Sequence, residues 1–288
     1  MTQSTAAPFI AADTALSAGQ STRTVWRQKR HGLSVAEDDQ LATEVPIALQ
    51  YNGISHAVLL ATPTFLEDLA IGFSFTEGII RSANDIYDVV IDQDERGYVL
   101  NIEIASACLN QLKQRRRQLA GRTGCGLCGL ESLNEVRRDL APVAPPVQPY
   151  SATAIFNALD QLRHRQPLHQ VTGATHAAGW ADLNGVIQVV REDVGRHNAL
   201  DKLIGHLLTH NTAVEKGLVV VSSRASFEMV QKTAALGASV LVAVSAPTTY
   251  AIQVADELGL LLVAFGREKQ FSAYSHPEFL QASTDYAC

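Results

Sequence analysis

The sequence has no uninterrupted apolar run of about 18 residues, the length that a membrane-spanning helix needs. It has only four cysteines in 288 residues, too few for a disulfide scaffold. No basic stretch followed by an apolar run and a cleavage site stands at its start. An excess of positive charge is also lacking, because 23 Lys and Arg face 29 Asp and Glu. We therefore expect no membrane and no nucleic acid among its partners, and a reducing cytoplasm as its location.

Apolar residues are abundant: they make up 47% of the chain, whereas charged residues make up 18%. That composition supplies a full core and is too poor in charge for a disordered protein. Four prolines within 141–150 cannot continue a helix and predict a stiff linker. The expected organisation is a disordered N-terminus at 1–20, an N-terminal α+β domain at 21–140, the Pro-rich linker, and an α/β domain at 151–280.

Periodic patterns predict the elements of the first half. Alternating apolar residues around an Asn-Gly turn predict a hairpin at 44–60, and a helix is expected to follow Thr62. Further strands are predicted at 86–91 and 98–104, and a second helix at 109–119.

The second half alternates all-apolar strands with helices, a pattern typical of a buried, mostly parallel sheet covered by helices. Ser151 is the predicted N-cap of the first of these helices. The predicted strands are 186–190, 218–221, 240–244 and 260–265, and the predicted helices are 151–163, 198–208, 227–236 and 250–258.

The segment 121–129 carries the most reactive chemistry in the chain. It holds Cys125 and Cys128 among four glycines, with Arg122 close by. Glycine lets the backbone turn freely, so we expect both thiols on a mobile, accessible loop. Neighbouring positive charge favours the thiolate, which is the nucleophile. Such a loop is suited to taking sulfur from one partner and delivering it to another.

Three other interpretations of this cysteine pair stay open on the residues alone. A structural zinc site would need four ligands, and Cys108 and Cys288 have no paired spacing. A thioredoxin-like redox pair would stand at the start of a helix after an early strand, whereas this pair follows a predicted helix. The third is a glycine-rich loop with incidental cysteines.

Three polar clusters, at 172–178, 192–202 and 222–226, lie beside predicted strands. The carboxyl ends of parallel strands form the usual ligand crevice of such folds, so we expect the clusters to share one edge and build a binding site. The first cluster contains His176, for which the alternative is an ordinary packed or surface histidine.

The other two clusters suit an anionic ligand. The second offers four polar side chains for a phosphorylated or heteroaromatic group: Asp193, Arg196, His197 and Asn198. The alternative is that Asp193 caps a helix and the rest face solvent. The third places Ser223 and Arg224 between a buried strand and a helix, a position that favours an anion. Here the alternative is that Ser226 is a plain N-cap.

On these motifs the chain resembles the formate dehydrogenase accessory sulfurtransferase family, FdhD. The likeness runs from about Thr62 to Tyr274. The segments that carry it are 62–63, 66–73, 76–80, 121–130, 175–178, 192–202 and 222–228.

The resemblance implies an α/β fold in which an N-terminal α+β domain precedes a cytidine deaminase-like α/β domain, assembled as a homodimer. It implies a sulfurtransferase that takes persulfide sulfur from a cysteine desulfurase. The acceptor is the molybdenum cofactor in its Mo-bis-molybdopterin guanine dinucleotide form, before insertion into the formate dehydrogenase catalytic subunit. This acceptor binds as a ligand, and no permanently bound metal is expected, because the sequence has no His-x-Glu paired with Pro-Cys-x-x-Cys.

The resemblance also assigns residues. Cys125 is the implied persulfide carrier and Cys128 its helper. The segment after the last strand is the implied cofactor site: Phe265, Gly266, Arg267, Glu268, Lys269 and Gln270. The cluster residues His176, Arg196, His197, Ser223 and Arg224 are expected to complete it. Two rival functions remain: a non-catalytic chaperone that binds the cofactor, and a nucleotide-binding metal protein.

Overall fold

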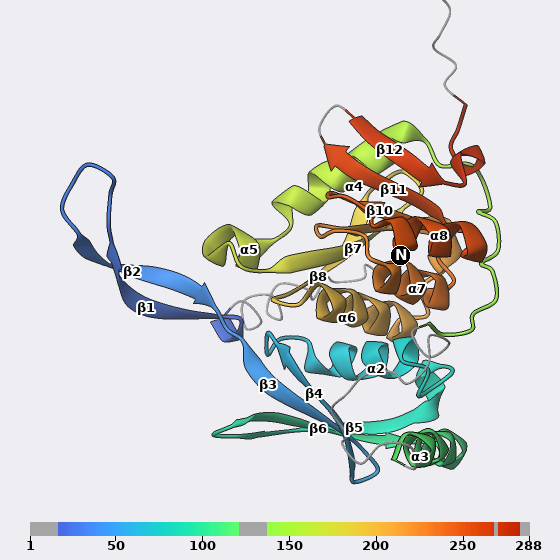
Figure 1. Cartoon of the computed structure of the whole chain (residues 1–288), viewed down its shortest axis with the longest axis horizontal. Coiled ribbons are helices and arrows are strands. Elements are labelled where there is room, and N and C mark those ends of the chain that lie inside the picture. The colour runs from blue at the N-terminus through green and yellow to red at the C-terminus, as the bar shows by residue number, and fades with distance from the viewer. Residues whose placement is uncertain (1–16, 121–136, 268–269, 283–288) are drawn as a thin grey trace, which may run out of the picture.

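The computed structural model describes residues 17–120, 137–267 and 270–282, and it shows a mixed α/β chain with three sheets (Figure 1). The first half contains β1 (Gln20–Arg27), β2 (Val35–Ala42), β3 (Val45–Tyr51), β4 (Ile54–Ala61), α2 (Leu66–Thr76), β5 (Ile86–Asp94), β6 (Gly97–Ile104) and α3 (Ser106–Ala120). The second contains α4 (Ala152–His164), α5 (Pro167–Thr172), β7 (His176–Asp182), β8 (Ile187–Asp193), α6 (Arg196–Thr209), β9 (Gly217–Val221), α7 (Phe227–Leu236), β10 (Val240–Ala243), α8 (Thr249–Leu258), β11 (Leu261–Arg267) and β12 (Gln270–Ser275). Among the described helices, none combines the length and apolarity that crossing a bilayer requires.

The first half is built on a four-stranded sheet of order β4-β3-β6-β5, in which β3 and β6 are parallel and the outer pairs antiparallel. The hairpin predicted at 44–60 is β3–β4. Its turn residues Asn52 and Gly53 have φ of 47° and 78°, the left-handed region that an Asn-Gly turn favours. Alternate side chains of β3 and β6 are buried, and they form one core with α2 and α3. The strands and helices predicted between 44 and 119 are confirmed.

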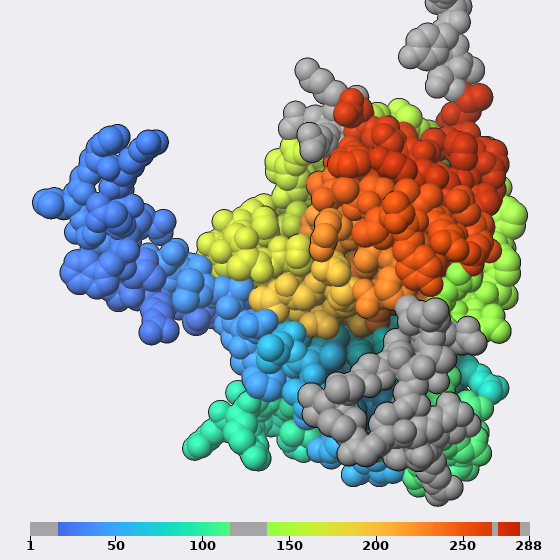
Figure 2. All heavy atoms as spheres, viewed as in Figure 1, coloured from blue at the N-terminus to red at the C-terminus, as the bar shows by residue number. Residues whose placement is uncertain are grey.

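β1 and β2 form a separate antiparallel ribbon that stands away from the body (Figures 1 and 2). Its side chains are largely exposed, including Trp26 at 76% and Leu33 at 87%. The sequence analysis predicted no strand here, because β2 contains three consecutive acidic residues and little apolar alternation. Gln20, the last residue of the predicted disordered segment, begins β1, and 1–16 lies outside the described residues.

The second half is a three-layer arrangement around a six-stranded sheet of order β12-β11-β10-β9-β7-β8. Helices α6, α7 and α8 share a core with one face of the sheet, and α4 shares a core with the other. Within β9, Val219 and Val221 belong to the first core and Leu218 and Val220 to the second. This division explains why β9 is apolar throughout. Ser151 caps α4 as predicted, because its Oγ accepts a hydrogen bond from Ala154 N at 3.0 Å.

The expectation of a mostly parallel sheet is wrong. Only the β9–β10 and β10–β11 pairs are parallel, whereas the β7–β8, β7–β9 and β11–β12 pairs are antiparallel. The chain passes from β7 to β8 and from β11 to β12 through connections too short for the helical crossover that parallel neighbours require.

The two halves meet where α2 crosses α6, and we call this contact, with the segment 60–64 before α2, the seam (Figure 1). Glycines allow the close approach. A Cβ on Gly72 would lie 1.7 Å from the backbone oxygen of Asp201, and one on Gly205 would lie 1.9 Å from that of Asp68. Any other residue at either position would therefore push the helices apart.

A buried ion pair locks the seam. The Lys202 and Asp193 side chains are both 0% exposed, and Lys202 Nζ donates to Asp193 Oδ2 at 2.6 Å. Lys202 Nζ also donates to Thr62 O at 2.8 Å, and Thr62 N donates to the same Asp193 oxygen at 3.0 Å. Burial lowers the pKa of Lys202, and Asp193 opposes that effect. The pair thus ties the entry to α2 to the end of β8.

Candidate functional site

Motifs far apart in the chain meet at one edge of the six-stranded sheet. The parallel strands β9, β10 and β11 end there, and we call it the carboxyl edge. Because β7 runs antiparallel to both neighbours, its first residue, His176, lies at this edge opposite Asp193, the last residue of β8. Ser222, directly after β9, holds the start of β7, since Ala177 N donates to Ser222 Oγ at 2.8 Å. The prediction that the three polar clusters share one sheet edge is confirmed.

A cavity of about 430 Å³ opens at the carboxyl edge, a volume in the range of small-molecule sites. Two of the residues proposed from the sequence, His176 and Gly266, line it. Its other polar walls are Asp160, Arg163, Gln166, His169, Thr175 and Ser222. With an arginine, two histidines and hydroxyl groups around it, the cavity suits a ligand that carries both a ring and negative charge.

Glu192, on β8, fixes two residues of the cavity wall, His169 and Thr175. Its carboxylate accepts hydrogen bonds from Leu168 N at 3.0 Å, His169 N at 2.8 Å and Thr175 Oγ1 at 3.0 Å. Burial raises the pKa of Glu192, and these hydrogen bonds oppose that effect. His169 Nδ1 lies 2.8 Å from Thr175 O, so α5 and the start of β7 are held together at the rim of the cavity.

His176 is the predicted binding residue with the clearest electrostatic signature. Burial lowers its pKa, and the positive charge of Arg196 acts in the same direction. The imidazole is therefore neutral near pH 7 and offers one donor and one acceptor to a ligand.

Arg196 and His197 begin α6 beside this site. The Nε atom of Arg196 is buried and has no hydrogen-bond partner among the described residues, so it is available to an acceptor. His197 Nε2 lies 2.8 Å from Glu228 Oε2, and this contact lowers the pKa of Glu228. His197 is thus fixed by the first turn of α7, whereas Arg196 Nε can still donate a hydrogen bond to a ligand.

Ser223 and Arg224 lie next to the cavity without lining it. Ser223 is 4% exposed and its hydroxyl donates to Arg224 O at 3.0 Å. The Arg224 side chain is exposed. The neighbouring Ser222, which the sequence analysis did not single out as a ligand, is the serine of this cluster that faces the cavity.

The segment 265–270 is divided between the cavity, the surface and the undescribed residues. Gly266 lies against α4, where a Cβ would come within 2.6 Å of Leu159 Cδ1. Phe265 has φ of 53°, and the register between β11 and β12 shifts here, which marks a bulge. Arg267 ends β11 opposite Gln270, whose side chain is exposed. Glu268 and Lys269 lie outside the described residues.

Asp193 and Asn198, considered for ligand binding above, serve the seam instead. Besides binding Lys202, Asp193 accepts from Gly195 N at 2.8 Å. Gly195 is the N-cap residue of α6, so this bond holds the turn before the helix and is not the cap that the alternative expected. Asn198 Nδ2 donates to Leu60 O at 2.9 Å and to Asp193 Oδ1 at 3.1 Å. Both side chains are buried, so their polar groups are used within the protein.

Sequence reasoning missed Asp160, Arg163 and His169 as cavity residues. Asp160 and Arg163 occur on an amphipathic helix among other polar residues, and nothing in the sequence distinguishes them from surface charges. His169 follows a proline at the start of a six-residue helix that was not predicted. Asp160 and Arg163 come to the cavity because α4 packs on the sheet, and His169 comes there because Glu192 and Thr175 hold α5.

Cys125 and Cys128 lie within 121–136, outside the described residues. Cys108, in α3, is 5% exposed, and burial raises the pKa of its thiol. Its thiolate is disfavoured, which argues against a role in sulfur transfer. In the part of the chain that the structure describes, no three His, Cys, Asp or Glu side chains are grouped as a metal site would need.

Comparison with known proteins identifies the family. Residues 42–281 match the FdhD/NarQ family. The chain belongs to that family. It is 52% identical over 258 residues to the "Sulfur carrier protein FdhD" of Cupriavidus necator, covering 90% of this chain and 89% of that protein. It is 48% identical over 262 residues to the protein of the same name from Xanthomonas campestris pv. campestris, covering 91% and 92%.

A solved structure shows the same fold. It is titled as a putative formate dehydrogenase accessory protein from Desulfotalea psychrophila. It superposes with a TM-score of 0.71 at 22% identity and covers 91% of this chain and 99% of that one. The FdhD family predicted from the sequence is confirmed, and the sulfur-carrier function predicted with it is the one that the FdhD relatives are named for.

Proposed function

We propose that this member of the FdhD/NarQ family carries sulfur as a persulfide on Cys125 and transfers it enzymatically, as a sulfurtransferase. The observation that carries the proposal is the 52% identity over 90% of the chain to a protein named as a sulfur carrier. The chain's own residues support it, because Cys125 and Cys128 stand among glycines beside Arg122.

Sulfur transfer takes place in two thiol exchange steps. The Cys125 thiolate attacks the terminal sulfur of a cysteine desulfurase persulfide, forming a persulfide on Cys125 and releasing the desulfurase thiolate. Attack of Cys128 on the inner sulfur then forms a Cys125–Cys128 disulfide and releases the outer sulfur as sulfide to the acceptor. A cellular dithiol reductant must reduce the disulfide before the next cycle. We infer a cytoplasmic location, where such reductants are present.

The acceptor in this proposal is Mo-bis-molybdopterin guanine dinucleotide, bound as substrate before it enters formate dehydrogenase. One guanine nucleotide end would occupy the cavity at the carboxyl edge. Of the residues that line the cavity, neutral His176 suits hydrogen bonding to a ring and Arg163 suits phosphate. Arg196 does not line the cavity, but its Nε, which has no partner among the described residues, is a further donor beside it. Gly266 leaves room where any side chain would meet Leu159.

The finer points of architecture and assembly belong to the same proposal. We infer a cytidine deaminase-like domain at 151–280, supported by parallel β9–β11 with helices on both faces. The proposal keeps an N-terminal domain at 21–140, the linker at 141–150 and a homodimer. The partners are a cysteine desulfurase and the formate dehydrogenase catalytic subunit.

Mass spectrometry of the intact protein after incubation with a cysteine desulfurase and cysteine tests sulfur loading. We expect an added sulfur atom on the wild-type protein and its loss in Cys125→Ala. Cys128→Ala should still load but deliver sulfur more slowly. Cys108→Ser is the matched control and should load normally, since Cys108 is buried. Normal loading of Cys125→Ala would exclude Cys125 as the carrier, and a chaperone that binds the cofactor would then be the better description.

Calorimetric titration with guanosine diphosphate tests the acceptor site. We expect His176→Ala to weaken binding by about 0.5–1.5 kcal/mol, the usual worth of a neutral hydrogen bond. His210→Ala is the control, because His210 is exposed and its ring contacts the backbone of its own helix. Equal affinity of both variants and the wild type would place the nucleotide outside this cavity.

A further inference from the structure

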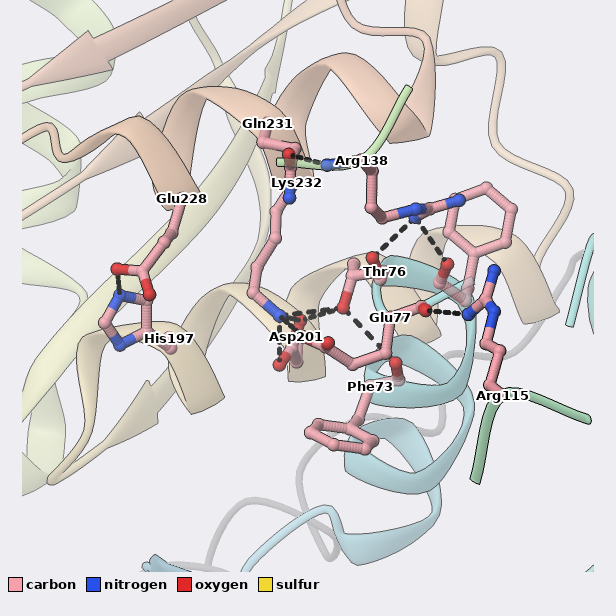
Figure 3. A network of polar contacts seen from close by, with 11 residues as sticks. Phe73, Thr76, Glu77, Arg115, Arg138, His197, Asp201, Glu228, Gln231 and Lys232 are labelled. Atoms are coloured by element: carbon pink, nitrogen blue, oxygen red, sulfur yellow. Dashed lines mark hydrogen bonds and ion pairs between the residues drawn. The ribbon is translucent and has the colours of Figure 1, made fainter. Parts of the chain in front are cut away.

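The C-terminus of α2 is bound by two arginines (Figure 3). The last carbonyl groups of a helix have no partner within the helix and carry the negative end of its dipole. Arg138 Nη1 donates to Phe75 O at 3.0 Å and to Thr76 O at 2.5 Å. Arg115 Nη1 donates to Glu77 O at 3.3 Å. Three successive carbonyls are therefore held by two guanidinium groups.

The structure provides a fitted site for Arg138. Its backbone N donates to Gln231 Oε1 at 2.7 Å, so α7 holds the main chain while α2 holds the side chain. Gly78 has φ of 67°, and a Cβ there would lie 2.9 Å from Arg138 Nη2. Burial lowers the pKa of Arg138, and Glu77 opposes that effect. An arginine that is half-buried at this cost has a defined position.

The base of this site is a second buried lysine. Lys232, next to Gln231 on α7, donates to Asp201 Oδ1 at 2.9 Å and Oδ2 at 3.0 Å and to Thr76 Oγ1 at 2.8 Å (Figure 3). It also donates to Glu77 Oε1 at 3.2 Å. The end of α2 is thereby fixed to both α6 and α7, so it forms a rigid support for the two arginines.

The two arginines stand on either side of the segment that contains the loop cysteines. Arg115 lies on α3, which precedes the segment 121–136, and Arg138 is the second residue after that segment. The described chain on either side of the segment therefore contacts the same helix end. α7 also connects this point to the carboxyl edge, because Glu228 in its first turn holds His197.

We propose that Arg138 is a positioning residue for sulfur delivery, which fixes the returning end of the cysteine-bearing segment on the C-terminus of α2. This inference rests on the proposed carriage of sulfur by Cys125. Delivery requires near-contact of the reacting atoms, and small displacements of a reacting group reduce rates steeply. Loading from a separate desulfurase depends on exposure of the thiol, not on its distance from the bound acceptor. Arg138 therefore acts on delivery and not on loading.

The test compares Arg138→Ala with Arg137→Ala. Arg137 is the adjacent residue, and its side chain pairs with Glu257 away from α2. Each protein is loaded with persulfide, quantified by mass spectrometry, and mixed with molybdenum cofactor and apo-formate dehydrogenase. We expect Arg138→Ala to load normally, to bind guanosine diphosphate normally, and to deliver sulfur at least about ten-fold more slowly. Arg137→Ala should match the wild type, and Arg138→Lys should recover part of the rate.

A second variant keeps the test decisive if Arg138→Ala does not fold. Gln231→Leu removes only the acceptor for Arg138 N, whereas Gln231→Glu retains one, so the first should deliver slowly and the second normally. Delivery at the wild-type rate by Arg138→Ala, or by Gln231→Leu in its place, would overturn the inference. So would an equal loss of loading and delivery. Failure of the wild-type protein to load at all would instead overturn the proposed sulfur carriage.

Discussion

One histidine at the seam, His206, makes the stability of the protein depend on pH. Arg191 Nη2 lies 2.8 Å from His206 Nδ1, and Arg191 Nε donates to Asp68 Oδ2 at 2.7 Å. Burial, followed by the charge of Arg191, lowers the pKa of His206 from 6.5 to about 4. The neutral ring accepts from the guanidinium, and a protonated ring would lose that hydrogen bond and face a like charge.

The free energy of unfolding should therefore fall as pH drops from about 6.5 to about 4, because the unfolded chain takes up this proton first. The contribution is at most about 1.4 kcal/mol per pH unit, and less where solvent screens the ring. Urea unfolding at pH 7 and pH 5 measures it. His206→Gln keeps an acceptor for Arg191 and should show a flatter pH dependence than His210→Gln. Identical pH dependence in both variants would show that His206 does not contribute.

At the scale of elements, the α2–α6 contact restricts the residue type at two positions to glycine. Gly205→Ala would gain about 1 kcal/mol from helix propensity alone. Because its Cβ would lie 1.9 Å from Asp68 O, we expect a net loss of about 1–3 kcal/mol instead. Gly32→Ala is the control, since the nearest atom to its Cβ would be 3.7 Å away. Chemical denaturation gives the sign directly, and a stabilised Gly205→Ala would mean that the helices separate at little cost.

The same scale shows where sequence patterns succeed. The Asn-Gly turn, the apolar alternation of β3 and the apolar runs of β9 to β11 each follow from local chemistry, and these elements are where the sequence placed them. β7 was not predicted, because His176–Asp182 is mostly Ala and Gly, which are poor strand formers. Sequence patterns also did not predict strand direction, because a buried apolar strand has the same periodicity in either orientation.

Sequence patterns also predicted one part of the candidate site and misassigned another. Sequence motifs brought His176, Arg196 and the 222–226 cluster to one edge, since strand ends carry ligand residues. They did not distinguish Asp193, which binds Lys202 in the seam, from residues that face the cavity. Only the packing of β8 between β7 and the first half separates the two roles.

In the whole molecule, buried polar contacts join the two halves, beside Phe75, which packs against a core of each half. Lys202 reaches Thr62, Lys232 reaches Thr76, and Arg191 reaches Asp68, each from the second half to the first. Removing one partner of a buried ion pair such as Lys202–Asp193 typically costs about 3–5 kcal/mol. The β1–β2 ribbon contributes to none of the three cores and stands apart from the body of the molecule (Figure 2).

The contacts across the seam limit how genes of this family can recombine. A crossover within 141–150 would fall in a stretch without helix or strand and would join the first half of one relative to the second half of another. Each parent would then supply one side of the Lys202–Thr62 and Lys232–Thr76 contacts and one glycine of the α2–α6 pair. Asp193 and Asp201 would stay with their lysines. A hybrid without a hydroxyl at position 76 would take one acceptor from Lys232, and a hybrid without glycine at 72 or 205 would force the helices apart. Inheritance of the two halves is thus coupled through the residues of the seam that lie on α2, α6 and α7.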